Sequence, residues 1–489
     1  MKNAFLALLA ILVIFSQFMV YQRTSGAAGG LPVLYWATDN NITRQVTVDK
    51  YRVWLKKNGY PDMDVKVDNI NGSLQKLVIQ GAAGVGPDIM NLFGWDLHYL
   101  NQIGMVQPLD DLMADLKVPP ENHDPTVSNE LFAAGKRMGF SQNAGTSYYF
   151  VNLTWLRKIG MPPPPERWTV EAFEAYGRAY VEKANRDRKV SQRSFFINYV
   201  DRETFRRSYG VSYFNETLTA CALNRPEHVA LLKKIFDWTY TEHFLATRAE
   251  AESISVESGK GGGNWTSLFH NGTQALVWSG LPILISLREC AGPVDLGIAE
   301  CPSGGYRNSV SRTYATALYS GSANHKLARY FLLYLTSEPH NLEIAENGDQ
   351  MPPIPSFRER DAFRKPPAWP NEWNAHRVYK EKSSELGTPS EYSPFVAYNP
   401  YQKVERNAVD AYFSKVTSAE EACQTMEEQI NALIQANVAR SPENRARYDR
   451  ARAVQARIDA AKREGKKIPL DLVENPFLRR YYRETGKGL

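Results

Sequence analysis

The chain has 489 residues, of which 43% are hydrophobic and 23% are charged. This length and composition predict a globular protein with at least two hydrophobic cores, and they exclude a disordered chain. The formal net charge of +5 is concentrated at the end, because residues 440–489 hold fourteen Lys/Arg and seven Asp/Glu. The rest of the chain is nearly neutral, so we expect no nucleic-acid partner.

Residues 1–30 have the layout of a secretory signal. Lys2 precedes the apolar run 5–20, and the small residues 25–30 that follow offer a cleavage site after Ala27. The run is long for a signal core but shorter than the roughly 20 residues that span a bilayer. A retained N-terminal anchor is therefore the alternative. Both possibilities predict a periplasmic or other extracytoplasmic location, tethered to the cytoplasmic membrane in the second case.

The next part of the chain alternates between strand and helix patterns. Strands are indicated by clustered β-branched and aromatic residues, and helices by apolar residues at three- and four-residue spacing. The predicted elements are a strand at 33–38, a helix at 43–57, a strand at 64–68, a helix at 73–84 and a strand at 87–92. This alternation is typical of a parallel sheet with helices on its faces.

A second α/β half follows the four prolines at 162–165. A helix opens at Thr169, whose hydroxyl can cap the first turn. A strand at 195–200, a helix at 225–240 and a strand at 275–280 come next. We therefore predict two α/β halves.

The end of the chain is predicted to be helical. Ser418 and Glu421 form a capping-box pair at the start of one helix, and a second helix begins at Ser441. The apolar side of this second helix consists of Ala451, Val454, Ile458 and Ala461. A membrane-surface helix needs a broad face of large apolar residues. We therefore expect the tail to dock on the body, with attraction of its cations to an anionic membrane as the alternative.

Candidate ligand-binding residues follow two of the predicted strands. Asp39 comes after the first strand, and Trp95 and Asp96 come after the third. Ligands bind at the carboxyl ends of strands in open sheets of this kind. Planar aromatic rings together with carboxylates suit a ligand that offers an apolar face surrounded by hydrogen-bonding groups. Trp36, in the middle of a strand, can equally be a core residue.

The sequence gives no sign of catalysis, of a metal site or of a cofactor. It contains no G-x-S-x-G and no H-E-x-x-H, and the glycine-rich segments 81–86 and 259–264 lack the context of a phosphate loop. The cysteines form no C-x-x-C pair, which argues against zinc and redox motifs. The sequence is compatible with a Cys290–Cys301 disulfide and equally with four buried thiols. We expect a protein that is not an enzyme.

Five segments together resemble a known family. They are 84–113, 147–173, 268–287, 322–355 and 393–434. Their order over residues 31–440 resembles the carbohydrate-binding group of extracellular solute-binding proteins of ABC importers, to which the maltose-binding proteins belong. The four prolines, the lack of a lipid-anchor cysteine and the tail depart from the family pattern.

The resemblance implies an α/β, two-lobed periplasmic-binding-protein-like fold with hinge segments between the lobes, followed here by a helical C-terminal extension. Lobe 1 would comprise 31–141 and 313–357, and lobe 2 would comprise 142–312 and 358–440. The basic tail would be 441–489. Such lobes close on a ligand by a hinge motion.

The resemblance also implies further ligand-binding residues. Trp278, Gly280 and Leu281 match the wall of the second lobe. The other positions that match cleft-facing residues are Tyr199, Arg312, Tyr398 and Tyr401.

The resemblance further implies the partners of the protein. They are a carbohydrate ligand and the membrane permease subunits of an ABC importer, with the binding protein acting as a monomer. A sensor module for a membrane receptor is the alternative function, and a carbohydrate-active enzyme with a hidden carboxylate pair is a more remote one.

Overall fold

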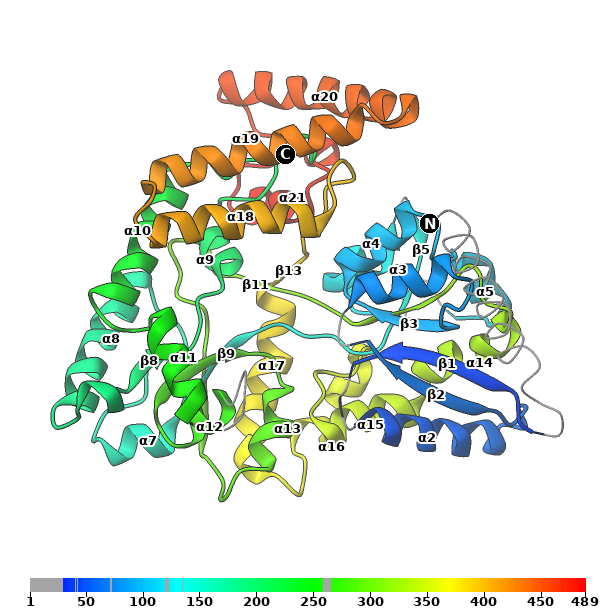
Figure 1. Cartoon of the computed structure of the whole chain (residues 1–489), viewed down its shortest axis with the longest axis horizontal. Helices are drawn as coiled ribbons and strands as arrows, with labels where there is room; N and C mark the ends of the chain where they lie inside the picture. Colours follow the sequence, from blue (N-terminus) through cyan, green and yellow to red (C-terminus); the bar gives the residue numbers. More distant parts are fainter. Residues whose placement is uncertain are drawn as a thin grey trace, which may run out of the picture. The chain divides into compact units, whose positions relative to one another are not determined.

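The computed structural model describes residues 30–39, 41, 43–70, 73–118, 123–133, 135–257 and 265–489 (Figure 1). Apart from Gly30, the expected signal or anchor at 1–30 lies outside these ranges. No helix within the described ranges is both long and apolar enough to span a bilayer.

The chain divides into two compact units. Unit 1 comprises the described residues up to Ala144, together with Arg312–Asn347 and Met351–Phe363. Unit 2 comprises Gly145–Ser311, Gly348–Gln350 and Arg364–Leu489. The lobe limits implied by the resemblance stay predictions.

Unit 1 is built on a five-stranded sheet with the strand order β2-β1-β3-β12-β6. Strand β1 is parallel to β2 and β3, whereas β12 is antiparallel to β3 and β6. Its strands are β1 (Val33–Thr38), β2 (Asp64–Asn69), β3 (Ile89–Leu92), β6 (Phe140–Ser141) and β12 (Ala315–Leu318), beside the short hairpin β4 (Phe132–Ala133) and β5 (Lys136–Arg137). Its helices are α2 (Thr43–Lys57), α3 (Leu74–Ala82), α4 (Gly94–Gln102), α5 (Asp110–Asp115), α6 (Ser128–Leu131), α14 (His325–Leu335) and α15 (Glu338–Asn347).

Both faces of this sheet are covered, because successive side chains of a strand point to opposite faces. In β1, Trp36 packs against Phe331 of α14, with ring centroids 4.9 Å apart. The next residue, Ala37, belongs to a different hydrophobic cluster that includes Leu77 of α3 and Leu97 of α4. Trp36 has no exposed surface and is a core residue.

Unit 2 contains a four-stranded sheet with the order β10-β7-β9-β8. Its strands are β7 (Tyr148–Asn152), β8 (Phe195–Ile197), β9 (Gln274–Ser279) and β10 (Leu296–Ala299), and a separate pair consists of β11 (Ser309–Val310) and β13 (Gly387–Thr388). The helices around these strands are α7 (Leu153–Lys158), α8 (Val170–Asn185), α9 (Arg202–Ser208), α10 (Pro226–Tyr240), α11 (Arg248–Glu257), α12 (Trp265–His270), α13 (Ile283–Arg288) and α17 (Trp373–Leu386). The short helix α16 (Asp361–Arg364) lies at the last boundary between the units.

The C-terminal helices belong to unit 2. They are α18 (Tyr398–Phe413), α19 (Ala419–Val438), α20 (Pro442–Arg463) and α21 (Pro476–Glu484), and Figure 1 shows α20 beside α19. The predicted capping box at Ser418 and Glu421 is present.

The tail is docked, which confirms the expectation from its apolar stripe. Ala451 and Ile458 of α20 are buried, and Phe477 and Leu478 of α21 are buried as well. Tyr306, which lies outside the tail, packs in the same hydrophobic cluster as Ile458 and Phe477.

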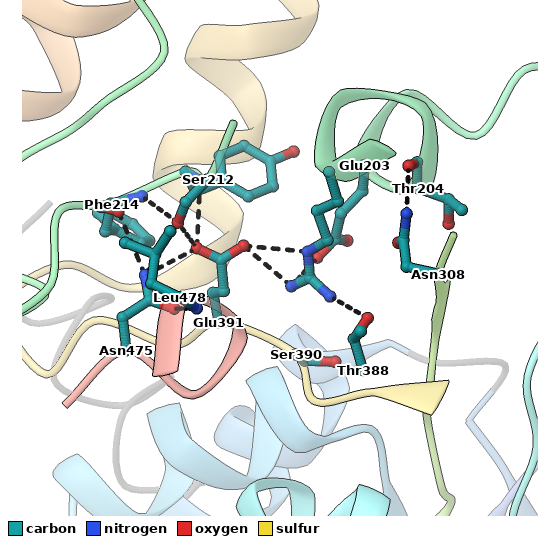
Figure 2. A network of polar contacts seen from close by, with 12 residues as sticks. Glu203, Thr204, Ser212, Phe214, Asn308, Thr388, Ser390, Glu391, Asn475 and Leu478 are labelled. Carbon is teal, nitrogen blue, oxygen red and sulfur yellow. Dashed lines mark hydrogen bonds and ion pairs between the residues drawn. The ribbon is translucent and has the colours of Figure 1, made fainter. Parts of the chain in front are cut away.

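A buried polar network, which we call the tail junction, also holds the tail (Figure 2). It joins Arg207, Glu391 and Asn475. The Glu391 carboxylate accepts hydrogen bonds from Arg207 Nη2 at 2.9 Å and from Asn475 Nδ2 at 3.0 Å. Asn475 in turn caps α21 by accepting a hydrogen bond from the Leu478 amide at 3.1 Å. Because all these groups are buried, the junction fixes the first turn of α21 to the body of unit 2.

None of the four cysteines, all of which lie within the described ranges, forms a disulfide bond. Of the two alternatives that the sequence left open, the Cys290–Cys301 bridge is absent from this structure. Cys221, Cys301 and Cys423 are buried, which agrees with the alternative of buried thiols, whereas Cys290 is half-buried. Burial raises the pKa of Cys221 to about 12, which keeps this thiol neutral and unreactive.

Candidate ligand-binding site

Residues from three strands meet at one edge of the sheet of unit 1. The parallel strands β1 and β3 end at this edge, and the antiparallel strand β12 begins there, because Ala315 is paired with Leu92. Asp39, Trp95 and Arg312 therefore come to the same edge from segments that are distant in the sequence.

Three aromatic rings and one guanidinium form a cluster at this edge. Phe93 stacks on Trp95 with centroids 4.5 Å apart and an interplanar angle of 19°. Tyr314 meets Phe93 edge-on, also at 4.5 Å. The guanidinium carbon of Arg312 lies 5.1 Å from the centroid of the Trp95 ring. All four side chains are half-buried. We call this cluster the aromatic edge.

Trp95 and Asp96, which the sequence placed after the third strand, lie in a helix and not in a loop. Helix α4 begins at Gly94, directly after β3, so both residues occupy its first turn. A Cβ atom on Gly94 would lie 2.4 Å from a carboxylate oxygen of Glu130, which accepts a hydrogen bond from the Gly94 amide at 2.9 Å. Only glycine fits this close approach. Trp95 remains half-buried, while Asp96 is only 8% exposed.

Asp39 is held by its own neighbours. Its two carboxylate oxygens accept hydrogen bonds from Nε and Nη2 of Arg44 at 2.8 and 3.0 Å. The backbone amide of Asn41 adds a third hydrogen bond at 3.3 Å. This is the ordinary turn role of an aspartate after a strand. A ligand contact by Asp39 stays a prediction.

Buried amides link strands β1, β3 and β12 of the sheet that carries the aromatic edge. The side chain of Asn91 accepts from Trp36 Nε1 at 3.0 Å and from Thr316 Oγ1 at 2.9 Å. It also donates to Gln142 Oε1. The backbone oxygen of Gln142 lies 3.0 Å from Nε2 of His340. Burial lowers the pKa of His340 to about 4, so its ring is neutral and can donate this hydrogen bond.

Unit 2 has a comparable edge, where β8 and β9 end. Tyr149 links two candidate residues there: its ring meets Trp278 at 5.0 Å, and its hydroxyl donates to the backbone oxygen of Tyr199 at 3.1 Å. Burial raises the pKa of Tyr149 well above 10, so the hydroxyl stays a donor. Asn198 accepts a hydrogen bond from the Trp278 amide at 2.8 Å. Trp278 is half-buried and Tyr199 is 49% exposed.

Gly280 allows a close approach by Gln350, which the sequence reasoning missed. A Cβ on Gly280 would lie 2.4 Å from Nε2 of Gln350, and a Cβ on Gly145 would lie 2.2 Å from its Oε1. Gln350 has a φ of 77°, which is unusual for a residue other than glycine. No local pattern could reveal this contact, because the three residues are far apart in the sequence.

The remaining candidates are core residues or pack next to the core. Leu281 is fully buried and Tyr401 is 1% exposed. Half-buried Tyr398 packs edge-on against Tyr401, with centroids 5.2 Å apart. Ligand contact by these three side chains stays a prediction.

Two cavities of unit 2 are lined by none of the candidate residues. One, of about 390 Å³, includes Arg288, Trp369 and Glu372 in its lining, and the other, of about 340 Å³, includes Glu216 and Tyr481. Over the ranges that the structure covers, no three His, Cys, Asp or Glu residues are grouped so that they could hold a metal ion.

Comparisons with known proteins identify the class. Residues 50–371 match the family described as bacterial extracellular solute-binding protein, and the chain belongs to this family. The predicted resemblance is thereby confirmed, and with it the extracytoplasmic location of the class. The family is non-enzymatic, which confirms the prediction that the chain is not an enzyme. A comparison with curated proteins gives no match.

Solved structures show the same fold at low sequence identity. The ABC substrate-binding protein Lmo0181 from Listeria monocytogenes, in complex with cycloalternan, has a TM-score of 0.69 and 16% identity, over 82% of this chain and 98% of that one. The maltose/maltodextrin-binding domain MalE from Bdellovibrio bacteriovorus, bound to maltotriose, has a TM-score of 0.62 and 18% identity, over 83% of this chain and 99% of that one. UgpB from Mycobacterium tuberculosis, in complex with glycerophosphocholine, has a TM-score of 0.66 and 13% identity, over 84% and 100%.

These likenesses establish the fold. The chain has the mixed α/β periplasmic-binding-protein fold with several sheets and additional C-terminal helices, as the sequence predicted. Because the identities are low, the ligands of these structures are properties of those proteins alone.

Proposed function

We propose that this solute-binding protein captures a sugar or oligosaccharide outside the cytoplasmic membrane and delivers it to the permease subunits of an ABC importer. The observation that carries the proposal is the aromatic edge of unit 1. Its rings are half-buried, so part of their surface can stack on a sugar ring. The Arg312 guanidinium beside Trp95 supplies donors for the hydroxyls around that ring.

The partial exposure of the aromatic edge favours binding over a purely structural role. A ring that only fills a core is buried on all sides, as Trp36 is. Trp95 and Tyr314 instead keep accessible surface at the carboxyl ends of parallel strands, where ligands bind in open sheets. Two of the structural relatives named above were solved with oligosaccharides, which supports a sugar, while the third was solved with glycerophosphocholine.

A ligand screen by thermal unfolding tests the proposal. The panel should contain monosaccharides, linear and cyclic glucose oligosaccharides, and glycerophosphocholine as the non-sugar member. A cognate sugar at 100 times its dissociation constant should stabilise the fold by about 2.7 kcal/mol. Stabilisation by glycerophosphocholine alone would refute the sugar proposal. Release of a cleaved product from a bound oligosaccharide would refute the binding-only role. Closure of the lobes stays a prediction, which X-ray scattering with and without the identified ligand can test.

A further inference from the structure

Helix α20 has one face on the protein and one face in solvent. Tyr448, Ala451, Gln455 and Ile458 are its buried residues, and they recur every three or four positions along one side. The side chain of Gln455 is anchored by Thr217, whose amide donates to it at 3.1 Å. Because the helix is docked through this side, its opposite side faces solvent.

The outward side is basic. Residues 442–467 contain nine Lys/Arg and four Asp/Glu, and all thirteen are exposed. The balance of +5 equals the formal net charge of the whole chain, so the remaining residues are neutral in sum. One helix and the turn that follows it therefore carry a positive balance equal to the net charge of the whole chain.

Four arginines form two rows on this side. Arg445 and Arg463 are eighteen residues apart, which is five helical turns, and Arg450 and Arg457 are seven apart, which is close to two turns. Within the part of the chain that the structure covers, these four guanidinium groups form no ion pair. By contrast, Lys462 is paired with the carboxylate of buried Glu216. The two rows are available for an external anion.

The surface between these rows consists mainly of small side chains. It carries Ala446, Ala453 and Ala460, which repeat every seven residues, and one exposed carboxylate, Asp449, one turn after Arg445. A specific protein partner needs large anchors such as Trp, Tyr or Met at the centre of an interface, and alanine supplies none. A diffuse array of negative charge needs no such anchor. The chemistry of the exposed face therefore fits anionic phospholipid headgroups better than a shaped protein surface.

We propose that the exposed face of α20 binds the headgroups of an anionic phospholipid bilayer while its other face stays docked on unit 2. The helix is about 33 Å long, so its arginines can lie along a flat membrane surface within a screening distance of about 8 Å. Docking and membrane attraction, which the sequence offered as alternatives, are then roles of opposite faces. The proposal is independent of which solute the protein binds.

Vesicle co-sedimentation tests this proposal with the chain from Leu31 onward, which holds every described helix and strand of both units. We expect binding to vesicles of phosphatidylcholine with about 30% phosphatidylglycerol and at least tenfold weaker binding to phosphatidylcholine alone. Replacing Arg445, Arg450, Arg457 and Arg463 by Gln should lower the first affinity at least tenfold, and high salt should abolish binding. The melting temperature should not change, because these side chains are exposed.

A matched control removes the same charge elsewhere. Lys56, Lys57, Lys66 and Lys326 are exposed residues of unit 1, and their joint replacement by Gln should leave vesicle binding unchanged. Equal losses in both quadruple variants would show a net-charge effect and overturn the assignment to α20. Equal binding to neutral and anionic vesicles would overturn it too, as would binding to an acidic protein partner without any binding to anionic vesicles.

Discussion

The tail junction of unit 2 and the aromatic edge of unit 1 are both assembled from segments distant in the sequence, but they differ in burial and charge. Arg207 and Glu391 have fully buried side chains that bond to each other. Trp95 and Arg312 are half-buried and keep accessible surface. A buried ionic group must be satisfied by its own protein, whereas a half-exposed ring can accept a ligand. We therefore expect substitutions at the junction to reduce stability and substitutions at the edge to reduce affinity.

The largest effect is expected for Glu391→Ala. This change leaves the Arg207 guanidinium with Glu203 as its remaining carboxylate, at 2.8 Å, and removes the charged acceptor of Asn475 Nδ2. Breaking a buried ion pair by removing one partner costs about 3–5 kcal/mol. Urea unfolding should show a loss of this size. Glu381→Ala, which removes one of the two carboxylate partners of exposed Arg377 and leaves Glu166, should cost less than about 1 kcal/mol.

The affinity of Glu391→Ala for the cognate solute should be unchanged wherever the variant is folded. A stability loss below about 1 kcal/mol would mean that the tail junction is not a structural network. A loss of affinity without a loss of stability would mean that the tail junction contributes to ligand binding, as we expect of the aromatic edge.

Acid should destabilise both units through buried neutral histidines that lie outside the tail junction and the aromatic edge. Burial lowers the pKa of His340 in unit 1 to about 4, and burial together with Arg206 lowers that of His228 in unit 2 to about 4. The unfolded chain, with a histidine pKa near 6.5, binds more protons than the folded chain between these values. The stability that depends on these two neutral histidines is therefore fully present above pH 6.5 and is lost as the pH falls through about 4.

Urea unfolding at about pH 7 and pH 4.5 measures this loss, which should be about 2 kcal/mol for each histidine. His340→Gln should remove the part of the stability loss that comes from His340, since the glutamine amide does not take up a proton. His270→Gln, at a half-buried position, is the control. Glu405 acts in the same direction but in a lower pH range: burial raises its pKa, but Arg202 and Arg206 outweigh burial and lower it to about 2. The contribution of the charged Glu405 to stability persists until the pH falls below about 4.5. An identical pH dependence in wild type and His340→Gln would contradict the assignment.

The sequence predicted those parts of the fold that depend on local patterns. The strand at Val33–Thr38 and the helix at Thr43–Lys57 agree with their predicted bounds, because burial in β1 and amphipathic spacing in α2 leave local traces. The position of Trp95 after β3 was predictable for the same reason. Tyr314 was missed, because it joins Phe93 only through the antiparallel pairing of β12 with β3, and no local pattern encodes this pairing.

Burial was harder to predict than position. Tyr199 and Tyr401 are the same residue type and both matched cleft-facing positions, yet Tyr199 is 49% exposed and Tyr401 is 1% exposed. The difference arises because Tyr401 packs against Tyr213 and Phe214, nearly 190 residues earlier in the chain. The partners of Glu391 are also distant, with Arg207 184 residues earlier and Asn475 84 residues later, so the tail junction left no signal in the sequence.

The smallest effect is expected for Trp95→Ala, which tests the aromatic edge itself. The change removes the surface that stacks on Phe93 and faces the Arg312 guanidinium, so the affinity for the cognate sugar should fall by about 1–2 kcal/mol. Titration calorimetry measures this loss. Trp373→Ala is the matched control, because Trp373 is 39% exposed and also has a cation near its ring, Lys365 at 5.8 Å. Its affinity should stay unchanged. If both variants bound the sugar as tightly as wild type, Trp95 would be a structural residue, and the aromatic edge would not be a ligand-binding site.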